Sequence, residues 1–394
     1  MKNICISLGC TLFLLALHGI STAQLNSQLP RYKIAVFAPL YLDSAFDVNE
    51  EYRYSKSFPK FFSPGLEFYE GVQLAADSLN KVGAPLDIQI YDTRSAMSSP
   101  ESVSQKPEFN NVQLIIGHVT NSEIRVLADI ARKKNIPFIN ANIPNDGGVT
   151  NNPSLVILNS TLRTHCQAIY KFLQKNYGNS PVIVFRKKGV QEDILKNYFT
   201  EVERSLPSAS LKLRYVTLNN DFTGAQLKSY LDSSLTICIA SSLDEKFATQ
   251  LCLALASIKE EYPTKVMGMP TWDGIKDFSK KEYKGLEIFY STPFYNAKTD
   301  KVSSGINNYF KTYLYSRPSD MVFRGYECIM RFGKLLMEKG ANIGSSIGEK
   351  KYRTFTDFDI QPVFLNKQSP TLDYFENKKL YFVKLQDGVV KAVY

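Results

Sequence analysis

The sequence predicts an α/β protein of two three-layer lobes with mainly parallel sheets, linked by hinges. Two observations carry this prediction. Continuous apolar runs bounded by turn residues alternate with segments of helical period, which is the pattern of parallel strands covered on both faces by helices. The alternation then begins again and runs to a similar length, which indicates a second lobe rather than a wider first sheet.

The first residues have the pattern of a secretory signal peptide. Lys2 precedes the apolar run 4–17, and the small residues 21–23 form a cleavage pattern. We therefore expect residues 1–23 to be removed and the protein to be exported to the periplasm. A lipid anchor on Cys10 is the less favoured alternative, because residues 7–9 are an imperfect lead-in. No later apolar run is long enough to span a membrane, so no membrane insertion is expected after cleavage.

Charge and cysteine usage narrow the function classes. The chain has 47 basic and 38 acidic residues, and removing residues 1–23 takes away only Lys2, which leaves 46 − 38 = +8. The basic residues are scattered without interleaved aromatic residues, so nucleic acid is not an expected partner. No cysteine spacing indicates a disulfide. The four cysteines beyond the leader are predicted to be free and buried, and they are Cys166, Cys238, Cys252 and Cys328.

The first series of elements runs from residue 33 to residue 158. Strands are expected over 33–40, 86–91, 112–117, 136–140 and 155–158, and helices over 66–81 and 121–134. The segment 43–65 is longer than the usual connection and carries many aromatic residues. It is expected either to form a lid over the strand ends or to fold back on the surface.

The second series repeats the pattern, and the tail departs from it. The second series has predicted strands over 181–186, 212–217, 235–240, 265–269 and 285–291, and helices over 162–176, 192–205, 223–232 and 243–260. The tail has predicted helices over 304–315 and 321–339, and hairpin-like strands over 355–360, 363–365, 379–385 and 389–393.

Signatures of catalysis are absent from the sequence. It has no GxSxG, GxxxxGK[ST], GxGxxG or HExxH motif. His118 and His165 are the only histidines beyond the leader, so no metal, cofactor or catalytic residue is expected and the protein is not predicted to be an enzyme. An exported hydrolase would need His118 as its base, whereas we expect His118 to pack under a turn. His165 and the adjacent Cys166 point apart on a helix and form no dyad.

Polar residues follow several strands at the edge where ligands of open α/β sheets bind. Thr120 and Glu123 fit a capping box at the start of helix 121–134. A helix start of this kind also attracts anions, although Glu123 would compete with an anionic ligand. Trp272 lies after another strand, where it would either cover a ligand or pack at a hinge.

The order of elements resembles the type I periplasmic binding proteins. The resemblance rests on KIAVFAPLY, LEFYEGVQLAADSLN, VQLIIGHVTNSE, VMGMPTWDG and GLEIFYSTPFY, and on SRPSDMVFRGYECIMRFGKLLMEKG in the tail. It is greatest to the branch with leucine/isoleucine/valine-binding proteins and the substrate-binding proteins of amino-acid ABC transporters. It implies an N-terminal lobe of residues 31–158 with 293–346, and a C-terminal lobe of residues 159–292 with 347–394.

The resemblance also implies a ligand site between the lobes. The implied contacts are Tyr41, Thr120, Asn121, Ser122, Ala141, Asn142, Arg186, Ser241, Ser242, Thr271 and Trp272. The insertion 43–65 departs from the family pattern, and only Glu123, Asp244 and Asp273 are evident partners for an amino group.

Two functions follow as expectations. The first is a receptor that holds an amino acid or related polar metabolite for an ABC permease. The second is an envelope regulatory protein, similar to peptidoglycan-synthase activators, that binds a protein such as a cell-wall synthesis enzyme.

Overall fold

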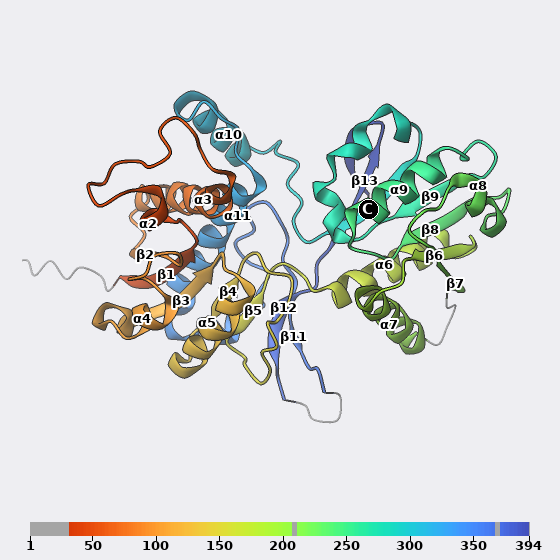
Figure 1. Ribbon diagram of the computed structural model, residues 1–394. Coiled ribbons are helices and arrows are strands. Elements are labelled where there is room, and N and C mark those ends of the chain that lie inside the picture. Colours follow the sequence, from red (N-terminus) through yellow and green to blue (C-terminus); the bar gives the residue numbers. More distant parts are fainter. Residues whose placement is uncertain (1–30, 207–210, 367–370, 394) are drawn as a thin grey trace, which may run out of the picture.

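The protein folds into two α/β lobes that lie side by side (Figure 1), as seen in a computed structural model that describes residues 31–206, 211–366 and 371–393. Each lobe contains a seven-stranded, mainly parallel sheet, and this confirms the predicted fold class. The first sheet has the order β11-β12-β5-β4-β3-β1-β2, and the second has the order β14-β13-β10-β9-β8-β6-β7. The predicted leader lies outside the described residues.

The bounds of the elements agree closely with the sequence pattern in both lobes. The strands are β1 Tyr32–Ala38, β2 Leu86–Asp92, β3 Val112–Gly117, β4 Phe138–Asn140, β5 Leu155–Ile157, β6 Val182–Arg186, β7 Leu213–Thr217, β8 Thr236–Ala240, β9 Thr264–Met267, β10 Glu287–Thr292, β11 Ile360–Val363, β12 Tyr374–Asn377, β13 Tyr381–Gln386 and β14 Val389–Val393. The α-helices are α2 Leu42–Ala45, α3 Ser63–Asn80, α4 Pro100–Ser104, α5 Asn121–Lys134, α6 Leu162–Tyr177, α7 Val190–Ser205, α8 Gly224–Leu227, α9 Glu245–Ala256, α10 Lys301–Tyr313, α11 Asp320–Cys328, α12 Lys334–Lys339 and α13 Ile343–Ser346.

Two long predicted helices are interrupted in the structure. The expected helix 321–339 divides at a π-helical turn, Ile329–Gly333, between α11 and α12. The expected helix 223–232 is α8 followed by a 3-10 turn, Lys228–Tyr230. Further 3-10 turns η4, η5 and η6, at Pro270–Gly274, Lys276–Ser279 and Lys281–Tyr283, link β9 to β10.

Alternating side chains of β1 build the two faces of the first lobe. Ile34 and Val36 belong to a core cluster shared with α3 and α11, whereas Ala35 and Phe37 belong to a second cluster shared with α5. Successive side chains of a strand point to opposite faces of its sheet, so the lobe has three layers. The carboxyl ends of the parallel strands β1, β3 and β4 therefore lie together at one end of the sheet.

The aromatic insertion lies folded back on the first lobe, which is one of the two expected arrangements. Rings of Phe61 and Phe62 lie 4.3 Å apart, and Tyr41 contacts both of them at 5.0 and 5.9 Å. Together with Leu66 and Tyr69 of α3, the insertion encloses an apolar cavity of about 590 Å³. This cavity lies within the first lobe and shares no lining residue with a second cavity of about 610 Å³ between the lobes.

The third crossing between the lobes was predicted at the wrong place. The family resemblance implied crossings near Asn159, Thr292 and Ile347 and assigned residues 347–394 to the C-terminal lobe, but β12 pairs in parallel with β5 of the first sheet and β11 pairs with β12. The chain therefore crosses after Asn377. The predicted strands 355–360 and 363–365 are replaced by β11 alone. Strand β12 was not predicted because Glu376 and Asn377 make it polar. The predicted strand 355–360 began at an apolar residue, Phe355, which lies in a loop and is buried against Phe323 of α11.

Two other sequence predictions are confirmed. Strands β13 and β14 form an antiparallel hairpin whose turn has positive φ at Asp387 and Gly388. The four cysteines predicted to be buried and unpaired are free thiols inside the lobes. Within the described ranges no helix combines the length and hydrophobicity needed to cross a membrane.

Helices α3 and α11 approach so closely that glycine is required at their contact. A Cβ atom on Gly325 would lie 2.1 Å from the carbonyl oxygen of Phe68, and one on Gly71 would lie 2.0 Å from that of Val322. The backbones therefore pack directly against each other, and this contact fixes α11 on the first lobe.

We predict that Gly325→Ala destabilises the first lobe, because the added methyl group must push α11 away from α3. The expected loss is about 1–3 kcal/mol in the free energy of unfolding. The matched control is Gly305→Ala in α10, where the new Cβ meets nothing within 4 Å. It is expected to stabilise by roughly 0.5–1 kcal/mol through helix propensity. Urea unfolding followed by circular dichroism measures both, and equal effects would contradict the packing argument.

Candidate functional site

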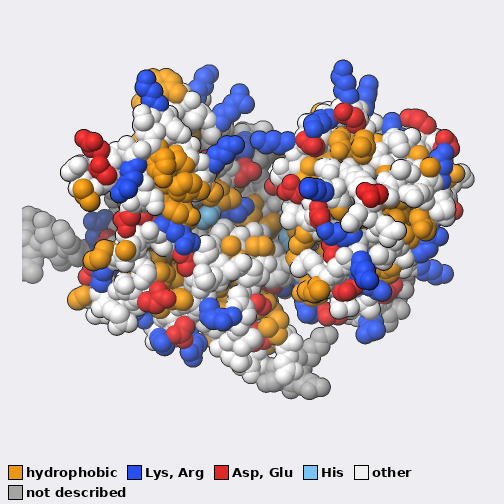
Figure 2. Space-filling view, viewed as in Figure 1, with side chains coloured by type: hydrophobic (Ala, Val, Ile, Leu, Met, Phe, Trp, Pro, Cys, Tyr) orange, Lys and Arg blue, Asp and Glu red, His pale blue; other side chains and the backbone are white. Residues whose placement is uncertain are grey.

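A cavity of about 610 Å³ lies between the two lobes, and Figure 2 shows the molecule hollowed there. Its volume falls in the range of small-molecule pockets. The residues that line it come from both lobes and from two of the crossings: Pro144, Asn145, Asn159, Ser160, Leu162, His165, Gln191, Leu243, Pro270, Thr271, Asp273, Thr292, Pro293, Phe294 and Arg324. A smaller cavity of about 170 Å³ adjoins it and shares Asp273, Thr292, Phe294 and Arg324.

The start of α5 carries its own compensating charges. Thr120 and Glu123 form the predicted capping box, in which the Thr120 backbone N–H donates to Glu123 Oε2 at 2.7 Å. The other carboxylate oxygen of Glu123 lies 3.3 Å from Nη2 of Arg94, a residue that the sequence did not single out. The positive end of this helix is thus already balanced by a buried carboxylate, and that carboxylate is itself paired.

The loop after β4 is tied to the loop after β3. The Asn142 side chain accepts from the Val119 N–H at 2.9 Å and donates to the Val119 carbonyl at 2.8 Å. The Asn145 amide donates to the side chain of Asn121 at 2.8 Å. Asn142 and Asn121 therefore hold the two loops together, and Pro144 and Asn145 are the members of these loops that reach the cavity.

Tyr41 and Ser122 also lie outside the cavity lining. Tyr41 packs within the aromatic insertion, with the Arg94 guanidinium 5.8 Å from its ring centroid. The Ser122 hydroxyl lies 3.1 Å from that of Thr120. On the first-lobe side, the predicted contacts thus surround the start of α5 rather than the base of the cavity.

Most predicted contacts in the second lobe are turned inward. Arg186 forms an ion pair with Asp193, and the Ser242 hydroxyl donates to Glu192 at 2.6 Å. Ser241 and Ser242 are completely buried, and Arg186 is nearly so. The physical reason is that the first turn of α7 brings Glu192 and Asp193 over the ends of β6 and β8, where they bind Ser242 and Arg186. The Ser241 hydroxyl is buried without a hydrogen-bond partner among the described residues.

Thr271 alone among the predicted second-lobe contacts lines the cavity. Trp272 beside it is 1% exposed and packs against Phe278, with ring centroids 5.1 Å apart. Its position agrees with the packing interpretation and not with a cover over a ligand. Among the described residues, no group of histidine, cysteine or acidic side chains is arranged to hold a metal ion.

Both histidines are held neutral. Burial, followed by the nearby charge of Arg324, lowers the pKa of His118 to about 4, and burial lowers the pKa of His165 to about 3. His118 packs 5.4 Å from the ring of Phe68, as expected for a histidine under a turn. Nδ1 of His165 lies 2.8 Å from the Ser291 hydroxyl. Burial raises the pKa of the Cys166 thiol, so the pair with His165 has no nucleophile.

The residues that the sequence analysis missed lie at the base of the cavity. Arg324 sits within helix α11, and Phe294 and Thr292 belong to the second crossing. The signal used to find candidates was a polar loop after an apolar strand, and Arg324 lies in a helix while the segment after β10, which begins with Pro293, Phe294 and Tyr295, is largely apolar. An arginine within the apolar sequence of α11 was the signal available for Arg324.

Comparison with known proteins shows the fold. No family model and no curated protein matches the chain. A putative branched-chain amino acid ABC transporter protein from Rhodospirillum rubrum aligns with a TM-score of 0.68 at 12% identity, covering 92% of this chain and 100% of the other. The leucine-binding protein LivK of Thermotoga maritima aligns with a TM-score of 0.52 at 16% identity, covering 92% and 98%.

A third solved structure is a complex with benzoate. A solute-binding ABC transporter protein from R. palustris in complex with benzoate aligns with a TM-score of 0.51 at 12% identity, covering 92% of this chain and 95% of the other. These neighbours are substrate-binding proteins, and the resemblance to the type I periplasmic binding protein fold is confirmed. At these identities the likeness is one of fold.

We predict that His118 makes the stability of the protein sensitive to mild acid. Its folded-state pKa is about 4 against 6.5 in the unfolded chain, so between these values the unfolded state binds a proton that the folded state does not. The free energy of unfolding is fully retained above pH 6.5 and falls by up to about 3 kcal/mol as the pH drops to 4.

Replacing His118 with Gln is expected to remove this part of the pH dependence. Chemical unfolding at pH 7, 5.5 and 4 measures it as the difference between variant and wild type. The comparison variant is His165→Gln, because the pH range over which His165 affects the free energy of unfolding extends from 6.5 to about 3. If the difference in unfolding free energy between His118→Gln and the wild type stays constant with pH, His118 takes up its proton in the folded protein as readily as in the unfolded chain.

Proposed function

We propose that the protein is an exported solute-binding receptor that holds an amino acid or related polar metabolite between its lobes for an ABC-type uptake system in the periplasm. The observation that supports this most directly is the cavity of about 610 Å³, to which both lobes contribute side chains. A ligand enclosed there would contact both lobes at once. Its binding energy would then favour the closed arrangement of the lobes.

The construction of the crossings supports closure by hinge bending. The lobes are separate sheets with separate cores, joined only by crossings near Asn159, Thr292 and Lys378. A few residues at the ends of elements are the usual site of hinge motion. Asn159, Ser160 and Thr292 line the cavity, so a ligand there lies beside two of the crossings.

An envelope regulatory protein is the second candidate, and the aromatic insertion favours it. Several large apolar side chains in the insertion or directly before it are well exposed: Leu42, Phe46, Phe58 and Phe61 are 48%, 41%, 53% and 47% exposed. Leu42, Phe46 and Phe58 border the apolar cavity of about 590 Å³. Exposed apolar clusters of this kind mark contact surfaces.

Pull-down from membrane extract separates the two candidates. A receptor is expected to recover a permease, and a regulator is expected to recover a cell-wall synthesis enzyme. Replacing Phe58 and Phe61 with Ser would abolish recovery of the enzyme if the insertion is the contact surface, while leaving the interlobe cavity intact.

We predict that Thr271→Phe blocks ligand binding without unfolding the protein. Thr271 is exposed and lines the cavity, so the larger ring occupies the space of a ligand at little cost to the core. A ligand retained through purification is identified by mass spectrometry and then titrated by calorimetry and by the fluorescence of Trp272, the only tryptophan. The expected loss of affinity is at least about tenfold, or about 1.4 kcal/mol.

The matched control is Thr150→Phe, an exposed threonine outside the cavity lining. It is expected to bind like the wild type. Unchanged affinity in Thr271→Phe, or equal losses in both variants, would place the ligand elsewhere and count against the receptor.

A further inference from the structure

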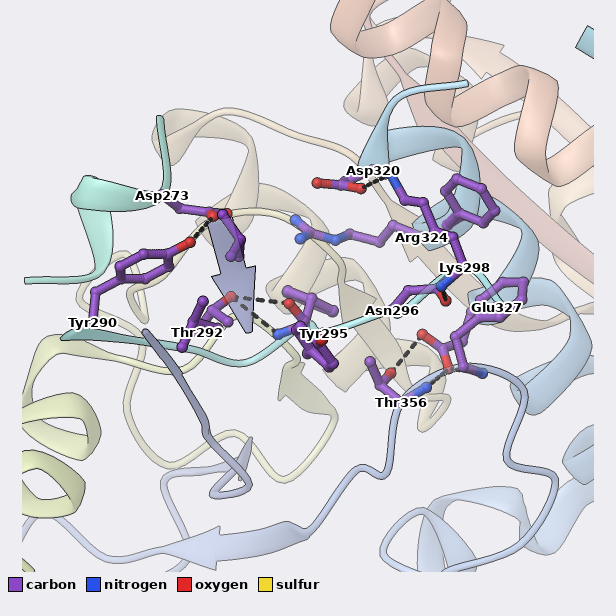
Figure 3. A pocket seen from close by; sticks show the side chains of 15 residues that line it. Asp273, Tyr290, Thr292, Tyr295, Asn296, Lys298, Asp320, Arg324, Glu327 and Thr356 are labelled. Carbon is purple, nitrogen blue, oxygen red and sulfur yellow. Dashed lines mark hydrogen bonds and ion pairs between the residues drawn. The ribbon is translucent and has the colours of Figure 1, made fainter. Parts of the chain in front are cut away.

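Arg324 occupies a particular position between the two lobes. It projects from α11 of the first lobe and lines both adjoining cavities. Its guanidinium carbon lies 3.4 Å from the ring centroid of Phe294, in the second crossing. Figure 3 shows the guanidinium extending away from its helix toward Asp273 and Tyr290 of the second lobe. Stacking on Phe294 fixes the plane of the guanidinium and leaves its N–H edges free to meet a ligand.

Arg324 has no hydrogen-bond or ion-pair partner among the described residues, and its Nε is buried. Burial lowers its pKa to about 10, so it keeps its charge at neutral pH. Arg324 is half-buried, and a guanidinium that is partly removed from water without a hydrogen-bonded partner is costly. The unpaired charge at the cavity therefore requires an explanation.

Arg331 shows how the same fold treats a structural arginine. It lies seven positions later along the continuous helical segment and is also buried near aromatic rings. Its guanidinium donates to the carbonyl of Lys351 at 2.8 Å and to that of Glu349 at 2.7 Å. The fold thus supplies carbonyl acceptors to Arg331, whereas no acceptor among the described residues is hydrogen-bonded to Arg324.

The acidic groups near Arg324 are engaged with other partners. Asp320 is paired with Lys298 at 2.9 Å, and Asp273 accepts from the Tyr290 hydroxyl at 3.0 Å. The buried carboxylate of Glu327 accepts from the backbone of Phe355 and Thr356 at 2.9 and 2.6 Å, and from the Thr356 hydroxyl at 2.6 Å. None of them forms an ion pair with Arg324.

We propose that Arg324 is the anion-binding group of the interlobe cavity and that it takes a carboxylate of the bound ligand. This rests on the receptor function proposed above and moves the anion site from the start of α5 to the base of the cavity. Among the cavity-lining residues Arg324 is the one permanent cation, because His165 is neutral. A guanidinium binds a carboxylate through two parallel hydrogen bonds, which a neutral amide does not reproduce.

The first test compares carboxylates with their amides. Calorimetry is performed with L-leucine and L-leucinamide, 4-methylpentanoate and 4-methylpentanamide, and benzoate and benzamide, on the wild type and on Arg324→Gln. We expect at least one carboxylate to bind, its amide to bind roughly 10- to 100-fold more weakly, and Arg324→Gln to lose a similar factor. The comparison variant Ser122→Ala, at the start of α5, is expected to retain affinity within about threefold.

The second test needs no ligand. Replacing a cation that has no hydrogen-bonded partner is expected to leave the melting temperature of the ligand-free protein unchanged or to raise it, whereas replacing one whose two terminal nitrogens are hydrogen-bonded lowers it. We therefore expect Arg324→Gln to melt at or above the wild type and Arg331→Gln to melt several degrees below it. If Arg324→Gln melts as low as Arg331→Gln, Arg324 serves structure and the proposal fails.

The outcomes separate this inference from the receptor function. If amides bind as well as carboxylates and Arg324→Gln binds both unchanged, the receptor stands and the anion site is overturned. If no probe binds and purification retains no ligand, both are overturned.

If Asp273→Asn weakens benzoate binding as much as Arg324→Gln does, the two residues form a latch between the lobes, which also overturns the proposal. We expect Asp273→Asn to keep or strengthen benzoate binding, because it removes a competing negative charge.

Discussion

The carboxylate of Glu376 links the two lobes through hydrogen bonds. It lies at the end of β12 in the first sheet, yet Oε1 accepts from the backbone and hydroxyl of Thr161 at 2.8 and 2.9 Å and from the Thr164 hydroxyl at 2.6 Å. These residues begin α6, the first helix of the second lobe. Lys378, in the third crossing, donates to Oε2 at 2.6 Å. Because a buried carboxylate needs all of these partners, the first and third crossings must run side by side.

The second crossing is left to form the base of the cavity. The first and third crossings are bound to each other, with the Ser160 hydroxyl also donating to the Asn377 carbonyl at 2.6 Å. The second crossing instead turns on itself through the Thr292 hydroxyl, which donates to the Phe294 carbonyl at 3.1 Å. This turn presents the ring of Phe294 to Arg324. Of the network that joins the first and third crossings, only Ser160 lines the cavity, whereas Glu376, Thr161 and Thr164 lie outside its lining.

Sequence patterns predicted the fold well because burial on two faces leaves a direct trace in the chain. The bounds of β3 and α5 were predicted without error, since an apolar run and a capping box mark them. Strand β12 left no such trace, because its polar residues are satisfied by the hinge and not by water. Its partner β5 lies more than 200 positions away in the sequence. Local periodicity contains no information about a pairing of that kind.

The candidate site was less predictable, because a polar residue at a strand end has two possible fates. Ser242 and Arg186 meet partners from α7 and become part of the interior, whereas Thr271 meets none and reaches the cavity. The difference depends on whether a neighbouring helix supplies a carboxylate at the right position, which only the packed structure reveals. Arg324 is the opposite case, a residue within a helix that remains without a partner among the described residues. It lies in the same helical segment as Arg331, whose guanidinium is hydrogen-bonded to two carbonyl groups, and the lack of a hydrogen-bonded partner, rather than its place in a motif, sets Arg324 apart.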